Sequence, residues 1–311
     1  MVFLFQENIS QFGGDPDGVT LLGQGTGAAL TSLLLLSPIT QANRKLFHRA
    51  ILTSGSSLAN SAIVTDPLDV MEQVASHTQC PINSRFSNCL RDIDVKTLMD
   101  VSIKSQLYSS PVGPYVDGTI VPEHPDVLMK KYSSKYDLLF GVTESEAYFL
   151  FPAFTVSYGV TDTEQRNILR SLLTSEYGVA GDTLEQIVKM VDNEYRDFHQ
   201  IREDKQINLK MLLDIFSDGR VVAPVLKSAN LHSNNRKSSY LYIFKQVTEN
   251  GFYPKQFGSI HGEDLAYILG MPLVGGTYHF VHNYTQEEKM LSENFMAYLV
   301  NFAKSGDPGS R

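Results

Sequence analysis

The chain has 311 residues, a formal net charge of −8 and 42% hydrophobic residues. The acidic balance and the lack of any basic block argue against nucleic-acid binding, and no run of 18 apolar residues could cross a bilayer. The length is sufficient to bury a sizeable core.

The amino-terminal segment, MVFLFQENIS, lacks the basic flank and the long apolar stretch of a signal peptide. We expect a helix here and a strand soon after it, so that the chain begins in the middle of a fold. Asn8 begins a glycosylation sequon, but it faces a segment that we expect to pack on the sheet, so we do not expect a glycan there.

Short apolar segments then alternate with helical ones, which is typical of a parallel α/β sheet. We expect strands at residues 19–22, 49–53, 136–141 and 239–244. Residues 28–36 predict a helix that is apolar on all sides and therefore covered on all sides. Residues 163–216 have helical periodicity and predict a helical cap above the sheet edge.

The two cysteines, Cys80 and Cys89, fit no zinc or redox motif. The segment between them is polar and rich in turn-forming residues, so the two sulfur atoms could meet. A short-loop disulfide formed in an oxidising compartment and two unrelated thiols are the two interpretations.

The last helix has clear boundaries, because Thr285 and Glu288 form a capping box and Gly306 follows its end. Two adjacent apolar faces run along it, formed by Leu291, Phe295, Tyr298, Leu299 and Phe302, and by Met296, Val300 and Ala303. Either both faces are core, or the second packs against another subunit. We expect a glycan at the Asn283 sequon, just before this helix.

Residues 19–29, VTLLGQGTGAA, have the layout of a nucleophile elbow, in which a strand, a G-x-?-x-G turn and a buried helix follow one another. The central residue of an elbow is held at positive φ so that its side chain projects into the site. That residue is Gly25, which has no side chain. Because the attacking atom of a serine esterase is the hydroxyl oxygen at this position, we predict that the chain is not a working serine esterase.

A dinucleotide-binding loop is the main rival for the glycine-rich turn. It needs G-x-G-x-x-G and an acidic residue about 20 positions later. Here the third glycine, Gly27, comes one residue early, and no acidic residue occurs between Gly27 and Asp66. The elbow is the better interpretation.

Two later loops supply the remaining members of a triad. Glu146 lies in GVTESEA directly after an expected strand, and His261 lies in GSIHGED before an apolar run. The chain order of nucleophile position, acid and histidine is that of α/β-hydrolases. A single histidine in a loop is usually structural, but three such positions in this order predict an α/β-hydrolase fold.

Motifs along nearly the whole chain resemble the cholinesterase (type-B carboxylesterase) family: FGGDP, VTLLGQGTGAA, FHRAILTSGSS, GPYVDGTIVPEHP, FGVTESEA, HGEDLAYILGMP and NFAKSGDP. Within this family, the glycine at the elbow and the run FSDGRVVAPVLKSANLHS are most similar to neuroligins, particularly invertebrate ones. Glutactin, gliotactin and neurotactin are inactive relatives with which the motifs are also compatible.

The resemblance implies that residues 1–311 form one partial α/β-hydrolase domain, the carboxyl-side half, with a mostly parallel sheet flanked by helices and a helical cap insertion. The upstream strands and the oxyanion-hole loop would be absent. It implies a degenerate triad at Gly25, Glu146 and His261, a Cys80–Cys89 disulfide, and no resident metal or cofactor.

The resemblance also implies a catalytically inactive extracellular domain that acts in synaptic cell adhesion, in a type I membrane protein whose anchor lies outside this chain. The partner would be a neurexin-type protein, with calcium only at the partner interface, and residues 143–149 would form part of the partner face. A homodimer would form through the last helix, at Leu291, Phe295, Met296, Leu299 and Val300.

Two alternatives remain. The chain could be an active carboxylesterase-family hydrolase with a non-standard nucleophile, for which Ser54, Ser56 and Ser57 are candidates, although none of them lies in G-x-S-x-G. It could also carry a small molecule in an old substrate gorge, which no feature of the sequence favours.

Overall fold

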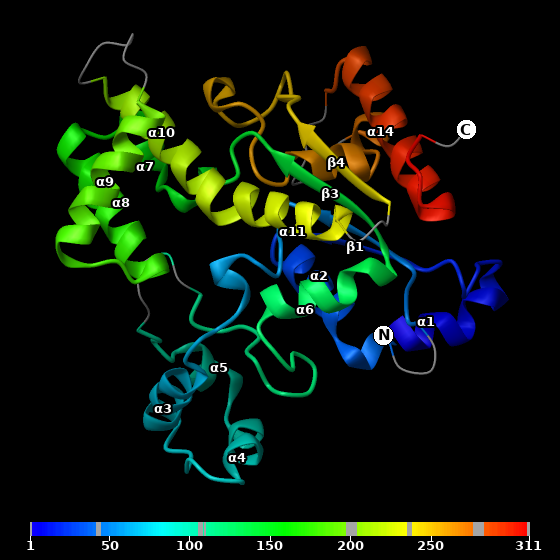
Figure 1. Ribbon diagram of the computed structural model, residues 1–311, viewed down its shortest axis with the longest axis horizontal. Helices are drawn as coiled ribbons and strands as arrows, with labels where there is room; N and C mark the ends of the chain where they lie inside the picture. The colour runs from blue at the N-terminus through cyan, green and yellow to red at the C-terminus, as the bar shows by residue number, and fades with distance from the viewer. Residues whose placement is uncertain are drawn as a thin grey trace.

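The fold is built on a parallel four-stranded sheet (Figure 1). The computed structural model describes residues 2–41, 45–104, 108, 110–196, 204–234, 238–275 and 283–309. The strands, in sheet order, are β1 (Thr20–Gln24), β2 (Arg49–Thr53), β3 (Asp137–Thr143) and β4 (Ser239–Phe244). All four predicted strands are confirmed, and β2 and β4 have the predicted bounds.

The sheet is covered on both faces, as the apolar strand sequences require. On one face Leu52, Leu138 and Phe140 pack in a cluster with α2 (Thr26–Leu36), α6 (Pro125–Tyr132) and α11 (Ala223–Ser233). On the other face Ile51 and Leu139 pack with α12 (Glu263–Ile268) and α14 (Gln286–Ser305). Neighbouring residues of one strand therefore point to opposite layers, which gives the three-layer α/β architecture.

The other α-helices are α1 (Val2–Asn8), α3 (Pro67–Thr78), α4 (Phe86–Asp92), α5 (Val95–Met99), α7 (Ala153–Tyr158), α8 (Asp162–Tyr177), α9 (Gly181–Tyr195), α10 (Lys205–Ser217) and α13 (Met271–Val274). None of the helices in the described parts of the chain combines the length and the apolar character needed to span a bilayer.

The predicted helical cap is confirmed, and it lies to one side of the sheet (Figure 1). Helices α7 to α10 enclose a second core of their own, which includes Leu169, Leu172 and Phe216. A capping box between Thr161 and Glu164 begins α8.

One unbroken helical rod joins the cap to the sheet. Helix α10 continues through a π-helical turn, Asp218–Val222, directly into α11. Pro224, at the start of α11, has no backbone N–H to donate and its ring crowds the preceding turn, which a widened π turn accommodates. The turn is tied to the cap, because Arg220 forms an ion pair with Glu176 and the Tyr195 hydroxyl donates to Asp218 at 2.7 Å.

Two expectations near the amino terminus are wrong. Helix α2 is not covered on all sides, since Leu30 is 45% and Leu34 is 39% exposed. It packs mainly on β1, β2 and α6, and part of its outer face stays exposed beside β1, the edge strand of the described sheet. The expectation that Asn8 faces a segment packed on the sheet is wrong as well, since Asn8 is exposed at the end of α1.

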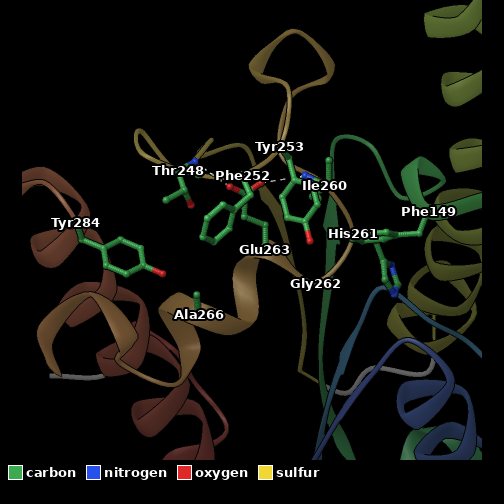
Figure 2. Close-up of a pocket in the computed structure, with 11 residues that line it drawn as sticks. Phe149, Thr248, Phe252, Tyr253, Ile260, His261, Gly262, Glu263, Ala266 and Tyr284 are labelled. Carbon is green, nitrogen blue, oxygen red and sulfur yellow. Dashed lines mark hydrogen bonds between the residues drawn. The ribbon is translucent and has the colours of Figure 1, made fainter. Parts of the chain in front are cut away.

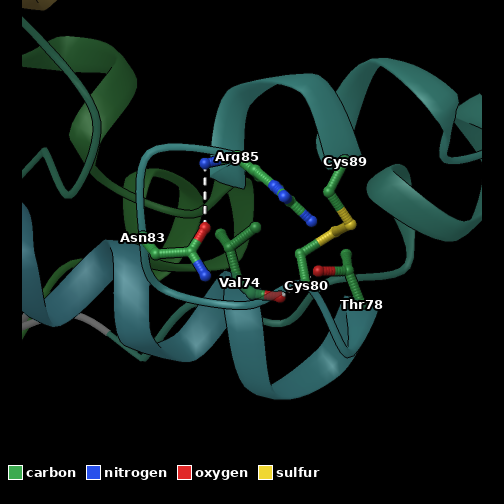
Figure 3. The surroundings of a disulfide bond; sticks show 6 residues. All are labelled: Val74, Thr78, Cys80, Asn83, Arg85 and Cys89. Atoms are coloured by element: carbon green, nitrogen blue, oxygen red, sulfur yellow. Dashed lines mark hydrogen bonds between the residues drawn. A yellow bond between two sulfur atoms is a disulfide. The ribbon is translucent and has the colours of Figure 1, made fainter.

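A lobe of three short helices, α3 to α5, projects from the main body (Figure 1). The disulfide between Cys80 and Cys89 is confirmed, with a Cα–Cα distance of 5.8 Å. Figure 3 shows it joining the segment after α3 to α4 across a tight turn, in which the Arg85 N–H donates to the Asn83 side chain at 2.8 Å. No residue of α3–α5 belongs to the three main core clusters, so this bond is a principal constraint on the lobe.

Helix α14 has the predicted capping box, with the Glu288 N–H donating to Thr285 at 3.2 Å. Phe295 and Leu299, which the dimer prediction assigns to a subunit interface, are only 9% and 7% exposed and belong to the core of this chain. The cause is the aromatic side of β4, where Phe244 stacks on Phe295 and Tyr242 meets it edge to face. Leu291 and Met296 are partly buried, and Val300 is exposed.

Candidate functional site

The predicted elbow has the backbone geometry of a strand-to-helix turn at Gly25. This residue has φ +57° and ψ −122° and lies between β1 and α2. Its N–H donates to the Thr53 carbonyl at 2.8 Å, and its carbonyl accepts from Ala28 and Ala29 at the start of α2. A positive φ is the conformation in which an elbow residue presents its side chain, and here only a hydrogen atom occupies that position.

Two neighbouring glycines allow the close approach that the elbow needs. A Cβ atom at Gly23 would lie 2.4 Å from the Gly27 carbonyl oxygen, and one at Gly55 would lie 2.1 Å from the Gly25 carbonyl oxygen. Both are backbone contacts that cannot yield easily. Any larger residue would push the elbow away from α2 or from the turn after β2.

Glu146 is held rigidly on the loop after β3. Its side chain is fully buried, and its Oε1 atom accepts from the Thr143 N–H at 2.7 Å and from the Ser54 hydroxyl at 2.7 Å. Charged hydrogen bonds of this kind offset the cost of burying a carboxylate. The other carboxylate oxygen faces His261.

His261 completes the predicted arrangement. Its Nδ1 atom lies 2.5 Å from Glu146 Oε2. The backbone N–H of His261 donates to the Ser145 carbonyl at 3.2 Å, which fixes the loop before α12 against the loop after β3. A Cβ atom built on Gly25 would lie 3.0 Å from His261 Nε2. The fold therefore brings Gly25, Glu146 and His261 together, in the chain order of a hydrolase triad.

Sequence reasoning missed a fourth member of the site. The side-chain amide of Gln24, the last residue of β1, lies 2.8 Å from His261 Nε2. In the elbow motif this residue is only a spacer between two glycines, and no local signal marks it as a contact of a histidine 237 positions later.

The three serines considered as replacement nucleophiles are all buried and bonded elsewhere. The Ser54 hydroxyl donates to Glu146, Ser56 bonds to Ser228 at 2.6 Å, and the Ser57 hydroxyl accepts from Ser32 at 2.7 Å. Ser54 has φ +54°, a strained value for a residue with a side chain. Its role here is to hold the acid.

His261 also forms part of the wall of a pocket of 240 Å³ (Figure 2). Four aromatic residues line much of it: Phe149, Phe252, Tyr253 and Tyr284. Glu263 lies beside them, with its carboxylate bonded to the N–H groups of Thr248 and Ile260 at 2.8 and 3.1 Å. None of the described lining residues is Lys or Arg.

A second carboxyl group is buried behind the site. Asp264 is fully buried, and burial raises its pKa. The Tyr242 hydroxyl donates to Asp264 Oδ2 at 2.7 Å, while Oδ1 has no partner among the described atoms. Burial and the neighbouring Asp264 raise the pKa of Tyr242 well above its usual value, so this hydroxyl stays protonated and keeps donating. Across the described residues no group of three or more His, Cys, Asp or Glu side chains could hold a metal ion.

Comparison with known proteins agrees with this geometry. The profile of the Carboxylesterase family matches residues 4–311. The chain is 32% identical over 308 residues to neuroligin-3 of Mus musculus and equally to neuroligin-2 of Rattus norvegicus, and 30% identical over 328 residues to neuroligin-1 of Caenorhabditis elegans. These alignments cover 97%, 97% and 96% of this chain, but 36%, 36% and 40% of the relatives, so the chain spans little more than a third of their length.

The neuroligin resemblance seen in the motifs is thus confirmed along almost the whole sequence. With a parallel sheet, an elbow, an acid on the loop after β3 and a histidine on the loop before α12, the chain belongs to the carboxylesterase family.

Proposed function

We propose that this chain is part of a catalytically silent, carboxylesterase-like recognition domain of the neuroligin type, which acts in cell adhesion. The observation that carries the proposal is Gly25 at the elbow, facing an otherwise intact His261–Glu146 pair. Removing the nucleophile alone costs about 10⁶ in kcat in a serine protease. The space for a replacement water is also small, because the imidazole lies where a Cβ atom at position 25 would be tightly packed.

Catalytic silence is tested with a p-nitrophenyl ester. The wild-type chain and its His261→Ala variant are expected to hydrolyse the ester at the same slow rate, set by the buffer and by surface groups. Turnover in the wild type that disappears in His261→Ala would show an active hydrolase and would overturn this part of the proposal.

For the partner we propose a neurexin-type protein, bound with calcium at the interface. Three exposed residues of the loop after β3, Glu144, Phe149 and Leu150, would contribute to the binding face. The support is the similarity to neuroligins. The test displays the full-length protein on cells and measures binding of a soluble neurexin ectodomain in calcium and in a chelator. Calcium-dependent binding that weakens in Phe149→Ala is expected, and no binding in calcium would rule out neurexin as the partner.

We further propose that the complete protein lies on the outer face of the plasma membrane at synapses, held by a segment outside this chain, and that Asn283 carries a glycan. Asn283 is exposed just before α14. Antibody staining of intact neurons and a mobility shift on glycosidase treatment, absent in Asn283→Gln, are expected. Staining only after permeabilisation would contradict the location.

A further inference from the structure

The hydrogen bonding around His261 defines which of its nitrogen atoms carries the proton. Glu146 Oε2 lies 2.5 Å from Nδ1, and a carboxylate can only accept a hydrogen bond. Nδ1 therefore carries the proton, and in the neutral ring Nε2 holds the free lone pair. In a working triad this lone pair takes the proton of the nucleophile.

The Gln24 amide occupies that lone pair. Its nitrogen lies 2.8 Å from Nε2. The amide must present this nitrogen, and not its oxygen, because the oxygen and the unprotonated Nε2 are both hydrogen-bond acceptors. Gln24 reaches this position because it ends β1 immediately before Gly25 and extends toward the His261 loop, where a Cβ atom at Gly262 would lie 3.5 Å from the amide nitrogen.

These contacts form a hydrogen-bond network in which both oxygens of Glu146 and both ring nitrogens of His261 have partners. Ser54 and the Thr143 N–H bond one oxygen of Glu146, His261 bonds the other, and Gln24 bonds the far side of the imidazole. A Cβ atom built on Gly25 would also lie 3.0 Å from Nε2. No atom of His261 that could act as a base is left without a partner.

We propose that Gln24 is a positioning residue that caps the general base, so that the site is silenced twice: by the missing hydroxyl at Gly25 and by an amide that engages the lone pair of His261. The inference deepens the proposed catalytic silence and rests on it. One consequence is that a hydroxyl introduced by Gly25→Ser would meet an imidazole whose Nε2 is already engaged.

The test measures acylation of His261 by diethyl pyrocarbonate, which attacks the free nitrogen of a neutral imidazole. Peptide mass spectrometry follows the rate in the wild type and in Gln24→Met, which keeps the length of the side chain but removes the donor. The His261 side chain is 27% exposed, so the reagent can reach it, and His124, at 63%, is the internal reference. Gln256→Met is the matched control, because Gln256 is exposed and its amide bonds the Gln206 side chain.

Loss of one hydrogen bond predicts an acylation rate at His261 about three- to tenfold higher in Gln24→Met, with no change at His124 or in Gln256→Met. An unchanged rate in a folded Gln24→Met variant would overturn the proposal. If that variant does not fold, ¹⁵N spectra of the wild-type imidazole decide: a protonated Nδ1 and a hydrogen-bonded, unprotonated Nε2 support the cap, whereas a protonated Nε2 at neutral pH overturns it. The ester assay with His261→Ala is a separate measurement, so failure of the silent-site proposal remains distinguishable from failure of the cap.

Discussion

His261 Nε2 lies so close to Gly25 that a Cβ atom there would be 3.0 Å away. The imidazole thus occupies part of the space that a nucleophile side chain would need. The glycine has two effects in this position: it places no side chain against the imidazole, and it avoids backbone strain at φ +57°.

Gly25→Ser and Gly25→Ala should both lower the free energy of unfolding, by about 1–3 kcal/mol, because each places a side chain at a strained dihedral and against the imidazole. Thermal or denaturant unfolding of the two variants measures this. Similar losses would show that the Cβ atom, and not the hydroxyl, is responsible.

Gly27→Ala is the control for these variants. Gly27 lies in α2 and has open space around its Cα, so alanine should stabilise the helix by about 0.5–1 kcal/mol. A Gly25→Ser variant with an unchanged or higher melting temperature would contradict the strained elbow.

Removing the disulfide should loosen the α3–α5 lobe without affecting the cap. The loop closed by Cys80 and Cys89 is short, with a sequence separation of 9, and the double change to serine should destabilise the lobe by roughly 2–3 kcal/mol. Hydrogen exchange is the measurement, with α8–α10 as the internal reference. Equal protection of α3 and α4 with and without the bond would contradict the prediction.

The hydrogen bond between Tyr242 and Asp264 predicts that the stability lost in a Tyr242→Phe variant depends on pH. The raised pKa of Asp264 means that the folded protein binds this proton more tightly than the unfolded chain. The contribution of the Asp264 proton to stability is therefore greatest below the pKa that Asp264 has in the unfolded chain. It falls as the pH rises through the higher pKa of Asp264 in the folded protein. Tyr242→Phe removes the described donor to the ionised carboxylate, so the loss of stability should be about 1–3 kcal/mol near neutral pH and smaller near pH 4.

Denaturant midpoints from pH 4 to pH 8 test this expectation. Tyr298→Phe serves as the control, because Tyr298 is 54% exposed and its hydroxyl should contribute little at any pH. A Tyr242→Phe penalty that is the same throughout this range would show that Asp264 does not ionise in the folded protein.

If α14 forms a homodimer, the contact must use residues that the core leaves exposed. These include Tyr298 at 54% and Val300 at 48%. Val300→Asp should shift the protein from dimer to monomer in light scattering coupled to gel filtration, because a charge would be buried without a partner. Lys304→Asp, at the exposed end of the same helix, controls for the added negative charge, and a dimer that tolerates Val300→Asp would exclude this surface.

The sequence is sufficient to place the strands and the triad positions, since these follow from local patterns. Strands β2 and β4 are short apolar runs between turn or charged segments, and their predicted bounds agree with the structure. The capping box of α14 is likewise a local code, carried by Thr285 and Glu288.

The features that the sequence could not predict depend on contacts between segments that are distant in the chain. The contact of Gln24 with His261 depends on two segments far apart in the chain, and the positive φ of Ser54 is stabilised by its bond to Glu146. The exposure of Leu30 and Leu34 could not be read from an all-apolar helix, because the pattern shows which side chains avoid water and not whether a neighbour is present to cover them.

The rod formed by α10, the π turn and α11 has a mechanical consequence. Residues 205–233 are helical without interruption, which at 1.5 Å per residue is roughly 40 Å. The cap and the sheet are therefore joined by one helical element, which contacts β3 and β4 through α11. The Arg220–Glu176 and Tyr195–Asp218 pairs fasten the π turn of this element to the cap, so a displacement of the cap should reach the sheet through a continuous helix rather than through a loop.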